Sequence, residues 1–459
     1  MAFDNITQLT LGNVIQIAFT NGVHNQMSLS YKDQEMVKRA LVDSSGAREI
    51  RFYFQNGLLP SNVQWRNPGQ SNRAFPRAFQ PATAEYTAKL KEVNASVELE
   101  YNLYERAKAT PEKYAQPLEM IVNSAVTSTK REIARAFWKD GTGVIGQVGA
   151  AAAALTSPVS NQLLFTLNQG DASRGHVGDF EYQEIYILRT AAGAATALDT
   201  SLATEPAYWK VMNKNRLAGT VLLQGLDSSF NPVANITSIS VQPESGSVFY
   251  KYDQPTIPDL TSISNYSDAT EMLVGLESLA ANDGRLVHGI TMSGITGATE
   301  IDCGANPIDL SYVNSGMDQV KIEVGPDQYS WKVMCCAPEV QSALIESRED
   351  DRRFTSKEDA RSGSKVFGFQ HRRDFIELSD SEYVHPKRLW ILPEQRSGDK
   401  VLEYHGSDFK AVKAPGGDDF RLKVDGGAYV NTMVSFMQAW GVLICHRPKA
   451  IVKLRNFTA

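Results

Sequence analysis

The chain has 459 residues, of which 42% are hydrophobic and 21% charged, and its formal net charge is −6, an ordinary globular composition with room for two or three domains. No apolar run is long enough to cross a bilayer, and the N-terminus has no basic region followed by an apolar block, so neither a membrane span nor a secretory signal is indicated. Mild acidity argues against a dedicated nucleic-acid binder, and the sparse cysteines Cys303, Cys335, Cys336 and Cys445 are expected to be reduced core residues rather than a disulfide framework or zinc site.

The first hundred residues predict an arm followed by a β projection. Residues 1–45 are polar and weakly periodic, which favours an extended arm with one short helix at 33–41, although a first strand and loop fits the composition equally well. Residues 48–54 have strand character, and residues 93–103 alternate between apolar and polar side chains, so that one face is apolar. Leu90 breaks this alternation and predicts a bend near Lys91. The two strands are expected to form a two-stranded projection.

The loop between these strands is rich in Pro, Asn and Gly, and it has no acidic residue before Glu85. Its arginines and aromatic residues are interleaved: Trp65, Arg66, Arg73, Phe75, Arg77 and Phe79. A loop this long and apolar is rarely an idle connection. Arginine with aromatics favours a contact between protein subunits. Single-stranded nucleic acid and packing on the chain's own body remain alternatives.

A single long helix is the strongest local prediction. Pro111 and Pro117 are typical of helix beginnings, and from Pro117 the apolar side chains fall largely on one stripe while charged and polar ones occupy the rest. Residues 117–138 would span roughly 33 Å at 1.5 Å per residue. The sequence Asp-Gly-Thr-Gly at 140–143 should end the helix sharply.

The remainder of the chain predicts a β module, an α/β region and a β-rich end. A small inserted β module is expected up to about Pro258, after an alanine-rich stretch at 146–157, with strands at 182–188, 220–223, 236–241 and 248–252. Helices on a mixed sheet are expected between 265 and 395. They comprise a helix capped by Asp268 and Glu271 and ended by Gly284, a helix over 310–320, a buried strand at 331–337, a helix opened by Pro338, and strands at 375–378 and 388–392. The end contributes strands at 420–424, 429–440, 442–445 and 450–454.

No catalytic constellation is found in the sequence. Residues 141–146 match G-x-G-x-x-G, but they follow the C-terminus of a helix, whose dipole repels phosphate. His371 to Asp374 has the wrong spacing for a kinase catalytic loop, and the seven histidines show no paired-ligand spacing. Cys335 lies in an apolar strand with no nearby histidine. No catalytic, cofactor-binding or metal-binding residue is therefore predicted.

The order of these elements resembles the major capsid proteins of tailed bacteriophages, whose fold is named after phage Hong Kong 97. The segment REIARAFWKDGTGVIGQV at 131–148 is similar to the end of the family's spine helix, and 308–324, 331–340 and 368–380 are similar to elements of its A-domain. The resemblance implies an α+β fold with an N-terminal arm (1–45), an E-loop projection (46–105), a P-domain with the spine helix (106–155), a β-rich insertion or P-domain elaboration (156–264), an A-domain (265–395) and C-terminal P-domain strands (396–459).

By the same resemblance, the chain would be a structural protein without enzymatic activity or cofactor. It would self-assemble into hexamers and pentamers of an icosahedral shell, formed in the host bacterial cytoplasm around double-stranded DNA that it does not read by sequence. Its E-loop would lie over a neighbouring subunit. Expected partners are many copies of itself, a portal and, because the sequence starts at Met1, a separate scaffolding protein; a decoration protein is a further candidate, and no membrane is expected. An encapsulin-like nanocompartment shell and an unrecognised α/β enzyme are the alternatives.

Overall fold

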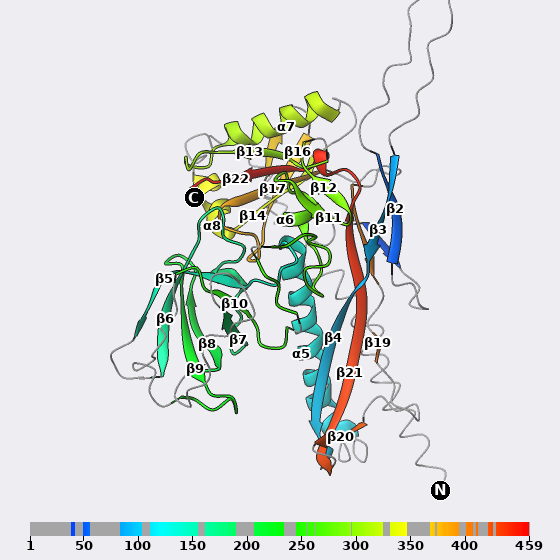
Figure 1. Ribbon diagram of the computed structural model, residues 1–459, viewed down its shortest axis with the longest axis vertical. Coiled ribbons are helices and arrows are strands. Elements are labelled where there is room, and N and C mark those ends of the chain that lie inside the picture. Colours follow the sequence, from blue (N-terminus) through cyan, green and yellow to red (C-terminus); the bar gives the residue numbers. More distant parts are fainter. Residues whose placement is uncertain are drawn as a thin grey trace, which may run out of the picture.

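The computed structural model describes residues 38–41, 49–55, 83–102, 111–154, 161–189, 206–233, 245–254, 256–260, 262–294, 296–324, 331–346, 368–371, 374–393, 401–406, 410–411, 421–425 and 428–458. Three parts meet at the C-terminal end of one long helix: a ribbon of long strands beside the helix, a mixed sheet beyond its end and a small barrel at its side (Figure 1). Among the described helices, none has the length and apolar character needed to cross a membrane.

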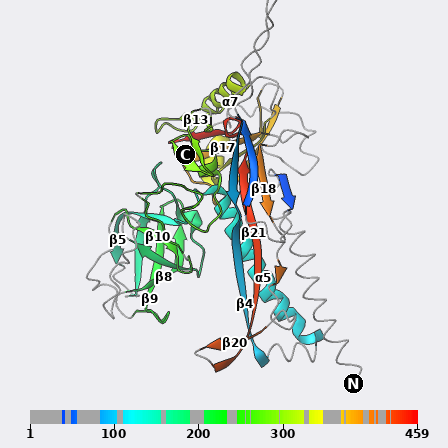
Figure 2. The same cartoon turned by 45° about the vertical axis from the view of Figure 1, so that its right-hand side comes forward.

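The long helix, α5 (Pro111–Trp138), has 28 residues and measures about 42 Å at 1.5 Å per residue. It packs along β4 (Lys91–Glu100), which pairs antiparallel with the 18-residue strand β21 (Ala428–Cys445), as Figures 1 and 2 show. Val97 and Leu99 are buried while Glu98 and Glu100 are exposed, which confirms the predicted alternation. The helix therefore lies against one face of a long, twisted ribbon.

The predicted two-stranded projection is wrong in its pairing. Strand β2 (Glu49–Gln55) pairs over its whole length with β3 (Thr83–Lys89), whereas β4 leaves this hairpin at Leu90 and joins β21. The break in alternation at Leu90 is thus the point where the chain changes sheets. β21, more than 300 residues away in sequence, pairs with β4 along the entire length of β4, which local patterning cannot reveal.

Shorter strands complete the ribbon. β18 (Leu402–Gly406), β19 (Lys410–Ala411) and β20 (Arg421–Asp425) all pair with β21. β1 (Lys38–Leu41) pairs in parallel with β18. Residues 38–41 were expected to end a short helix, so that prediction is wrong there: the ladder to β18 satisfies their backbone groups, and such tertiary pairing overrides a weak local preference.

The inserted module is a closed six-stranded barrel of order β10-β5-β6-β9-β8-β7. Its strands are β5 (Gly146–Ala154), β6 (Gln162–Leu167), β7 (Ile185–Arg189), β8 (Tyr208–Asn215), β9 (Thr220–Leu226) and β10 (Val248–Lys251). Phe165, Phe249 and Trp209 fill its interior with edge-to-face contacts at centroid distances of 5.1 and 5.2 Å. Strands were correctly predicted at β7, β9 and β10; the one expected at 236–241 lies outside the described residues.

The mixed sheet confirms the helix-on-sheet prediction. Its order is β13 (Thr299–Asp302), β22 (Val452–Arg455), β17 (Arg388–Pro393), β14 (Trp331–Cys336), β16 (Asp374–Asp380) and β15 (Gly368–His371), with both parallel and antiparallel pairs. Met334 and Cys336 pack with the buried side chains of α7 (Leu310–Val324) and α8 (Pro338–Glu346). Val333 and Cys335 pack in a second core with Phe137 and Trp138 from the end of α5. Alternate side chains of β14 therefore pack into two separate cores on the two faces of the sheet.

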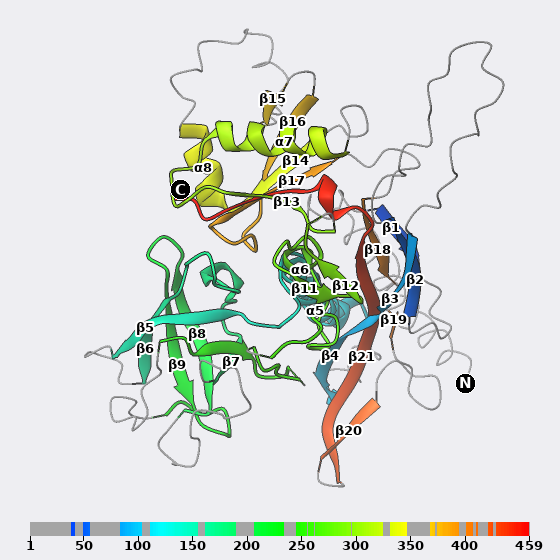
Figure 3. The same cartoon turned by 45° about the horizontal axis from the view of Figure 1, so that its top comes forward.

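One expectation in this region is wrong. The helix predicted from Asp268 to Gly284 is reduced to α6 (Leu276–Leu279), because the carbonyls of Ser267 and Thr270 accept hydrogen bonds from Lys91 Nζ, each at 2.7 Å, instead of helical amides. The strand predicted at 450–454 is found as β22, which inserts between β13 and β17 of the mixed sheet. The hairpin of β11 (Arg285–Val287) and β12 (Ile290–Met292) lies between sheet and ribbon (Figure 3).

Candidate functional site

The end of α5 is the point where the three parts are joined. Asp140 Oδ1 accepts hydrogen bonds from Thr142 N at 3.0 Å and Thr142 Oγ1 at 2.6 Å, and Ser278 Oγ donates to the Asp140 carbonyl at 2.8 Å. Gly141 and Gly143 have φ of +83° and +80°, a backbone region that favours glycine. The G-x-G-x-x-G match therefore lies in a left-handed exit from helix α5 into strand β5, whereas a dinucleotide-binding turn leads from a strand into a helix.

A layer of buried charges ties the last turns of α5 to the barrel. Lys139 Nζ lies 2.5 Å from Asp179 Oδ2, and both side chains are buried. Glu132 lies 2.5 Å from Arg135 and 2.6 Å from Lys251 of β10. Burial by itself would raise the pKa of Glu132, but the adjacent Arg135 and Lys251 cations outweigh it and hold this pKa at about 2. Glu132 is therefore ionised at neutral pH and takes part in a permanent bridge between helix and barrel.

A second charged group joins the barrel to the mixed sheet. Arg388 of β17 pairs with Asp171, which precedes the turn at 177–179 on the barrel side, and lies 3.2 Å from Glu277 of α6. Lys453 of β22 reaches the same Glu277 carboxylate at 2.8 Å. Burial opposes ionisation of Glu277, but Lys453 and Arg388 outweigh it and keep its pKa well below the ordinary value. Together the two groups fix the barrel against both helix and sheet.

Two buried histidines lie within this joint. The rings of His176 and His385 meet edge to face at 5.6 Å, and each residue is less than a tenth exposed. His176 Nδ1 accepts a hydrogen bond from Gly178 N at 2.9 Å, while Nε2 lies 3.2 Å from the Tyr383 carbonyl. Burial first, and then the Lys139 cation, lowers the pKa of His176 well below its ordinary value. These histidines are neutral, enclosed packing groups that a substrate cannot reach.

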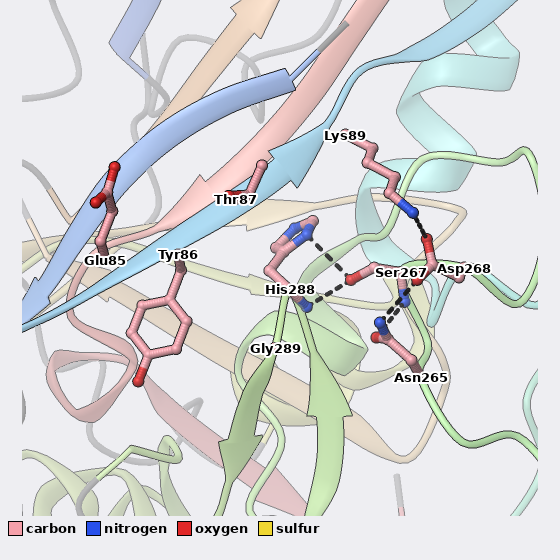
Figure 4. A pocket seen from close by; sticks show the side chains of 9 residues that line it. All are labelled: Glu85, Tyr86, Thr87, Lys89, Asn265, Ser267, Asp268, His288 and Gly289. Atoms are coloured by element: carbon pink, nitrogen blue, oxygen red, sulfur yellow. Dashed lines mark hydrogen bonds and ion pairs between the residues drawn. The ribbon is translucent and has the colours of Figure 1, made fainter.

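A polar pocket of about 300 Å³ lies at the root of the β2–β3 hairpin (Figure 4). One wall is β3, with Glu85, Tyr86 and Lys89; the opposite wall is the 265–268 loop and the turn at His288. Lys89 Nζ and Asp268 Oδ1, 2.8 Å apart, join the two walls. The pocket therefore marks where the projecting hairpin meets the body of the protein.

The pocket contains a serine–histidine contact that has the residue types of a catalytic pair. Ser267 Oγ lies 3.0 Å from His288 Nδ1, but it also accepts the His288 backbone amide at 2.5 Å. Both side chains are nearly fully buried, and the Asp268 carboxylate contacts Lys89 and Asn265 rather than the imidazole. Since a triad needs a third group orienting the histidine and an accessible nucleophile, this contact is a structural tie of the hairpin turn.

Aromatic packing anchors the hairpin root. Phe52 of β2 is 6% exposed and contacts Tyr86, His288 and His446, with ring centroids 6.1, 6.2 and 5.8 Å away. Tyr86 belongs to β3 of the same hairpin, whereas His288 lies in the β11–β12 turn and His446 follows β21, so two of the three contacts join the hairpin to other elements. The hairpin is thus fixed at its root, and its two strands point away from the body (Figure 1).

Six loop residues were predicted to contact other subunits: Trp65, Arg66, Arg73, Phe75, Arg77 and Phe79. All six lie outside the described residues, so their contact with other subunits stays a prediction. Burial of all four cysteines agrees with their assignment as core thiols, and it raises the pKa of Cys303 to about 11 and of Cys445 to about 12. Within the described ranges, no three His, Cys, Asp or Glu residues are grouped so as to hold a metal ion.

The sequence reading missed the charged joint. Arg135 was expected on the polar part of the long helix and Lys139 near the helix end, yet they are 3% and 7% exposed. The available signal was their position: basic residues crowded into the last turns of a helix, immediately before a β module with acidic residues at Asp179 and Glu184. That pattern suits the helix dipole as well, so the sequence alone could not distinguish a solvated end from a buried one.

No known family model matches the chain, and no curated protein matches it. Solved structures similar to it include the capsid asymmetric unit of cyanophage A-1(L), at 8% identity over 93% of each chain with a TM-score of 0.47. They also include the capsid of the native GTA particle, at 9% identity over 93% of this chain and 89% of that chain with a TM-score of 0.41. A virus-like particle from Pyrococcus furiosus is similar at 6% identity, over 95% of this chain and 96% of that chain, with a TM-score of 0.37.

Proposed function

We propose that this chain is the major capsid protein of a tailed double-stranded DNA bacteriophage with a Hong Kong 97-type fold. One observation carries the proposal: a 28-residue helix lies along a long β4–β21 ribbon, and a mixed α/β sheet, a barrel and a projecting hairpin are all fixed at or near one end of it. This is the arrangement of spine helix, A-domain and E-loop that the sequence resemblance implies. The barrel takes the place of the insertion.

The construction suits a structural protein better than an enzyme. Its buried charges bridge the parts of the fold to one another, as at Lys139–Asp179 and Lys453–Glu277. Its pocket in Figure 4 holds a Ser267–His288 contact without the third member of a triad. Rigid parts joined by paired, buried charges keep their relative orientation, which is what a subunit repeated many times in a curved shell requires.

Assembly would proceed by burying area between copies. The hairpin β2–β3 is the E-loop in this proposal and would lie over a neighbour, while the mixed sheet with α7 and α8 would gather around the capsomer axis as the A-domain. Hexamers and pentamers would close into an icosahedral shell in the host cytoplasm, with a separate scaffolding protein and a portal. The net charge of −6 suits a wall that encloses DNA without binding it tightly.

The test is to express the chain alone and together with a scaffolding partner, and to examine the products by size-exclusion chromatography and negative-stain microscopy. Closed shells, tubes, sheets or rings of six are expected. DNA protected from nuclease inside native particles would distinguish a virion from a nanocompartment shell. A monomer or dimer under all these conditions would refute the proposal and return attention to an enzymatic function.

A further inference from the structure

The outer surface of the barrel carries a cluster of three aromatic rings, of which Phe230 and Tyr252 are exposed and Tyr208 is partly buried. Phe230 stacks on Tyr208 with ring centroids 4.8 Å apart and an interplanar angle of 17°, and Tyr252 meets Phe230 edge-on at 5.7 Å. Phe230 is 45% exposed and Tyr252 is 48% exposed. Tyr252 directly follows β10, two positions after Tyr250, which packs with Val144 and Val248 in a cluster separate from the barrel interior. We call Tyr208, Phe230 and Tyr252 the aromatic cluster.

The backbone holds Phe230 in this exposed position against its own preference. Phe230 has φ of +64°, a region that residues with a Cβ atom rarely adopt. The Asp227 carboxylate stabilises the turn by accepting hydrogen bonds from Ser229 N and Asn231 N, each at 2.8 Å, and the Asp227 carbonyl accepts one from Phe230 N at 3.1 Å. A glycine would suit this backbone better. Since nearly half of the side chain stays exposed (45%) on a backbone that disfavours it, recognition explains its presence better than folding does.

The chemistry of the aromatic cluster favours a cation. Ring faces carry negative potential and attract arginine in particular, whose planar guanidinium stacks on them. Asp227 lies in the Phe230 turn, and Asp253 follows Tyr252 and is exposed, so acidic groups flank the cluster. Elsewhere in the chain such a pair is already formed: Arg285 lies 4.6 Å from the centre of the Tyr266 ring. In the part of the chain that the structure describes, no cation lies over the aromatic cluster.

The same chain supplies cations of this kind. Between β2 and β3 the sequence contains Arg66, Arg73 and Arg77 and no acidic residue. The β2–β3 hairpin from which this segment continues lies on the opposite side of the β4–β21 ribbon from the barrel, in both Figure 1 and Figure 3. This placement favours a contact between two copies over one within a single copy.

We propose that the aromatic cluster is the docking site for arginine side chains of residues 56–82 from a neighbouring copy of this chain. The inference rests on the proposed function to the extent that shell assembly brings the two copies together. Guanidinium groups would stack on the exposed faces of Phe230 and Tyr252, with Asp227 and Asp253 adding charge complementarity. The barrel would then take part in the contacts between subunits that hold the shell together.

The test uses the full-length chain in its unassembled form and a fluorescently labelled peptide of residues 56–82, with binding followed by polarisation. Phe230→Gly removes the ring and suits the left-handed backbone, so the variant should keep or raise the thermal unfolding temperature. Binding should weaken by about fivefold, the change expected for loss of an exposed cation–π contact. Replacing the three peptide arginines with glutamine should abolish it. Leu217→Ala, which removes an apolar side chain that is 88% exposed on the same barrel, should leave binding unchanged.

Three outcomes would overturn the inference: equal binding to wild type and Phe230→Gly, equal binding of the glutamine peptide, or binding of neutral oligosaccharides to the cluster without binding of the peptide. Microscopy separates this inference from the proposed function. Normal shells from a Phe230→Gly chain that binds peptide as wild type does would leave the capsid proposal standing and remove this one. If no shells form in any condition, but the peptide binds through its arginines and Phe230→Gly weakens that binding, the docking inference would stand and the capsid proposal would fall.

Discussion

Removing the amino group of Lys139 should destabilise the joint strongly. In wild type, Lys139 Nζ lies 2.5 Å from Asp179, whose side chain is 0% exposed. Lys139→Met would leave that carboxylate buried without its cation, a change that typically costs about 3–5 kcal/mol. The matched control is Lys89→Met, because Lys89 makes a comparable contact with Asp268 at 2.8 Å but both side chains are roughly half exposed. Such a surface pair contributes at most about 1 kcal/mol.

The pH dependence of this variant provides a second readout. Burial raises the pKa of Asp179 above its ordinary value of 3.8, and Lys139 opposes that rise. An acid whose pKa is higher in the folded state than in the unfolded one binds more protons when folded, so folding is favoured at low pH and this gain is lost as pH rises through the folded pKa. Without Lys139 the pKa of Asp179 should rise further, and the deficit of Lys139→Met should shrink between pH 7 and pH 5.

The assay is urea unfolding of the unassembled full-length chain at pH 7 and pH 5, followed by tryptophan fluorescence. Lys139→Met combined with Asp179→Asn should recover a large part of the loss, because the buried group is then neutral. A deficit no larger than that of Lys89→Met, or one that stays constant between the two pH values, would refute the idea that a buried, charge-compensated contact holds the barrel to the helix.

Three further predictions concern the root of the β2–β3 hairpin, the turn after α5 and the bridge between α5 and the barrel. Phe52→Ala should cost about 3–5 kcal/mol and speed hydrogen exchange in β2 and β3, while exchange in the barrel stays unchanged; uniform protection would show that Phe52 does not anchor the hairpin. Gly143→Ala should destabilise the fold by about 1–2 kcal/mol, because φ is +80° and a Cβ would lie 2.3 Å from the Gln254 side chain. In calorimetry, adding Gln254→Ala should restore only the stability lost to this steric contact, and the loss caused by the backbone conformation should remain. Because the folded pKa of Glu132 is lowered to about 2 from 4.5, its stabilisation is present above pH 4.5 and lost as pH falls toward 2, so Glu132→Gln should flatten acid unfolding in that interval.

Local sequence patterns predicted most elements correctly. The helix α5, the alternation in β4, the buried strand β14 and the helices α7 and α8 all follow from periodicity and from proline at helix beginnings. The errors share one cause. The helix expected from Asp268 failed because Lys91 takes its carbonyls, and β4 left the hairpin because β21 offers a longer partner. Both competing contacts come from residues more than 170 positions away.

The sequence by itself determined the local conformations, the lack of a recognisable catalytic motif and the resemblance that led to the capsid proposal, because these depend on residues close together in the chain. Only the tertiary structure decided which strands pair, that strands β5 to β10 close into a barrel, and that the charges at the end of α5 are buried rather than solvated. It alone gathered Tyr208, Phe230 and Tyr252 into one cluster. Pairing, burial and clustering all depend on contacts across long sequence separations, and short-range periodicity carries no information about those.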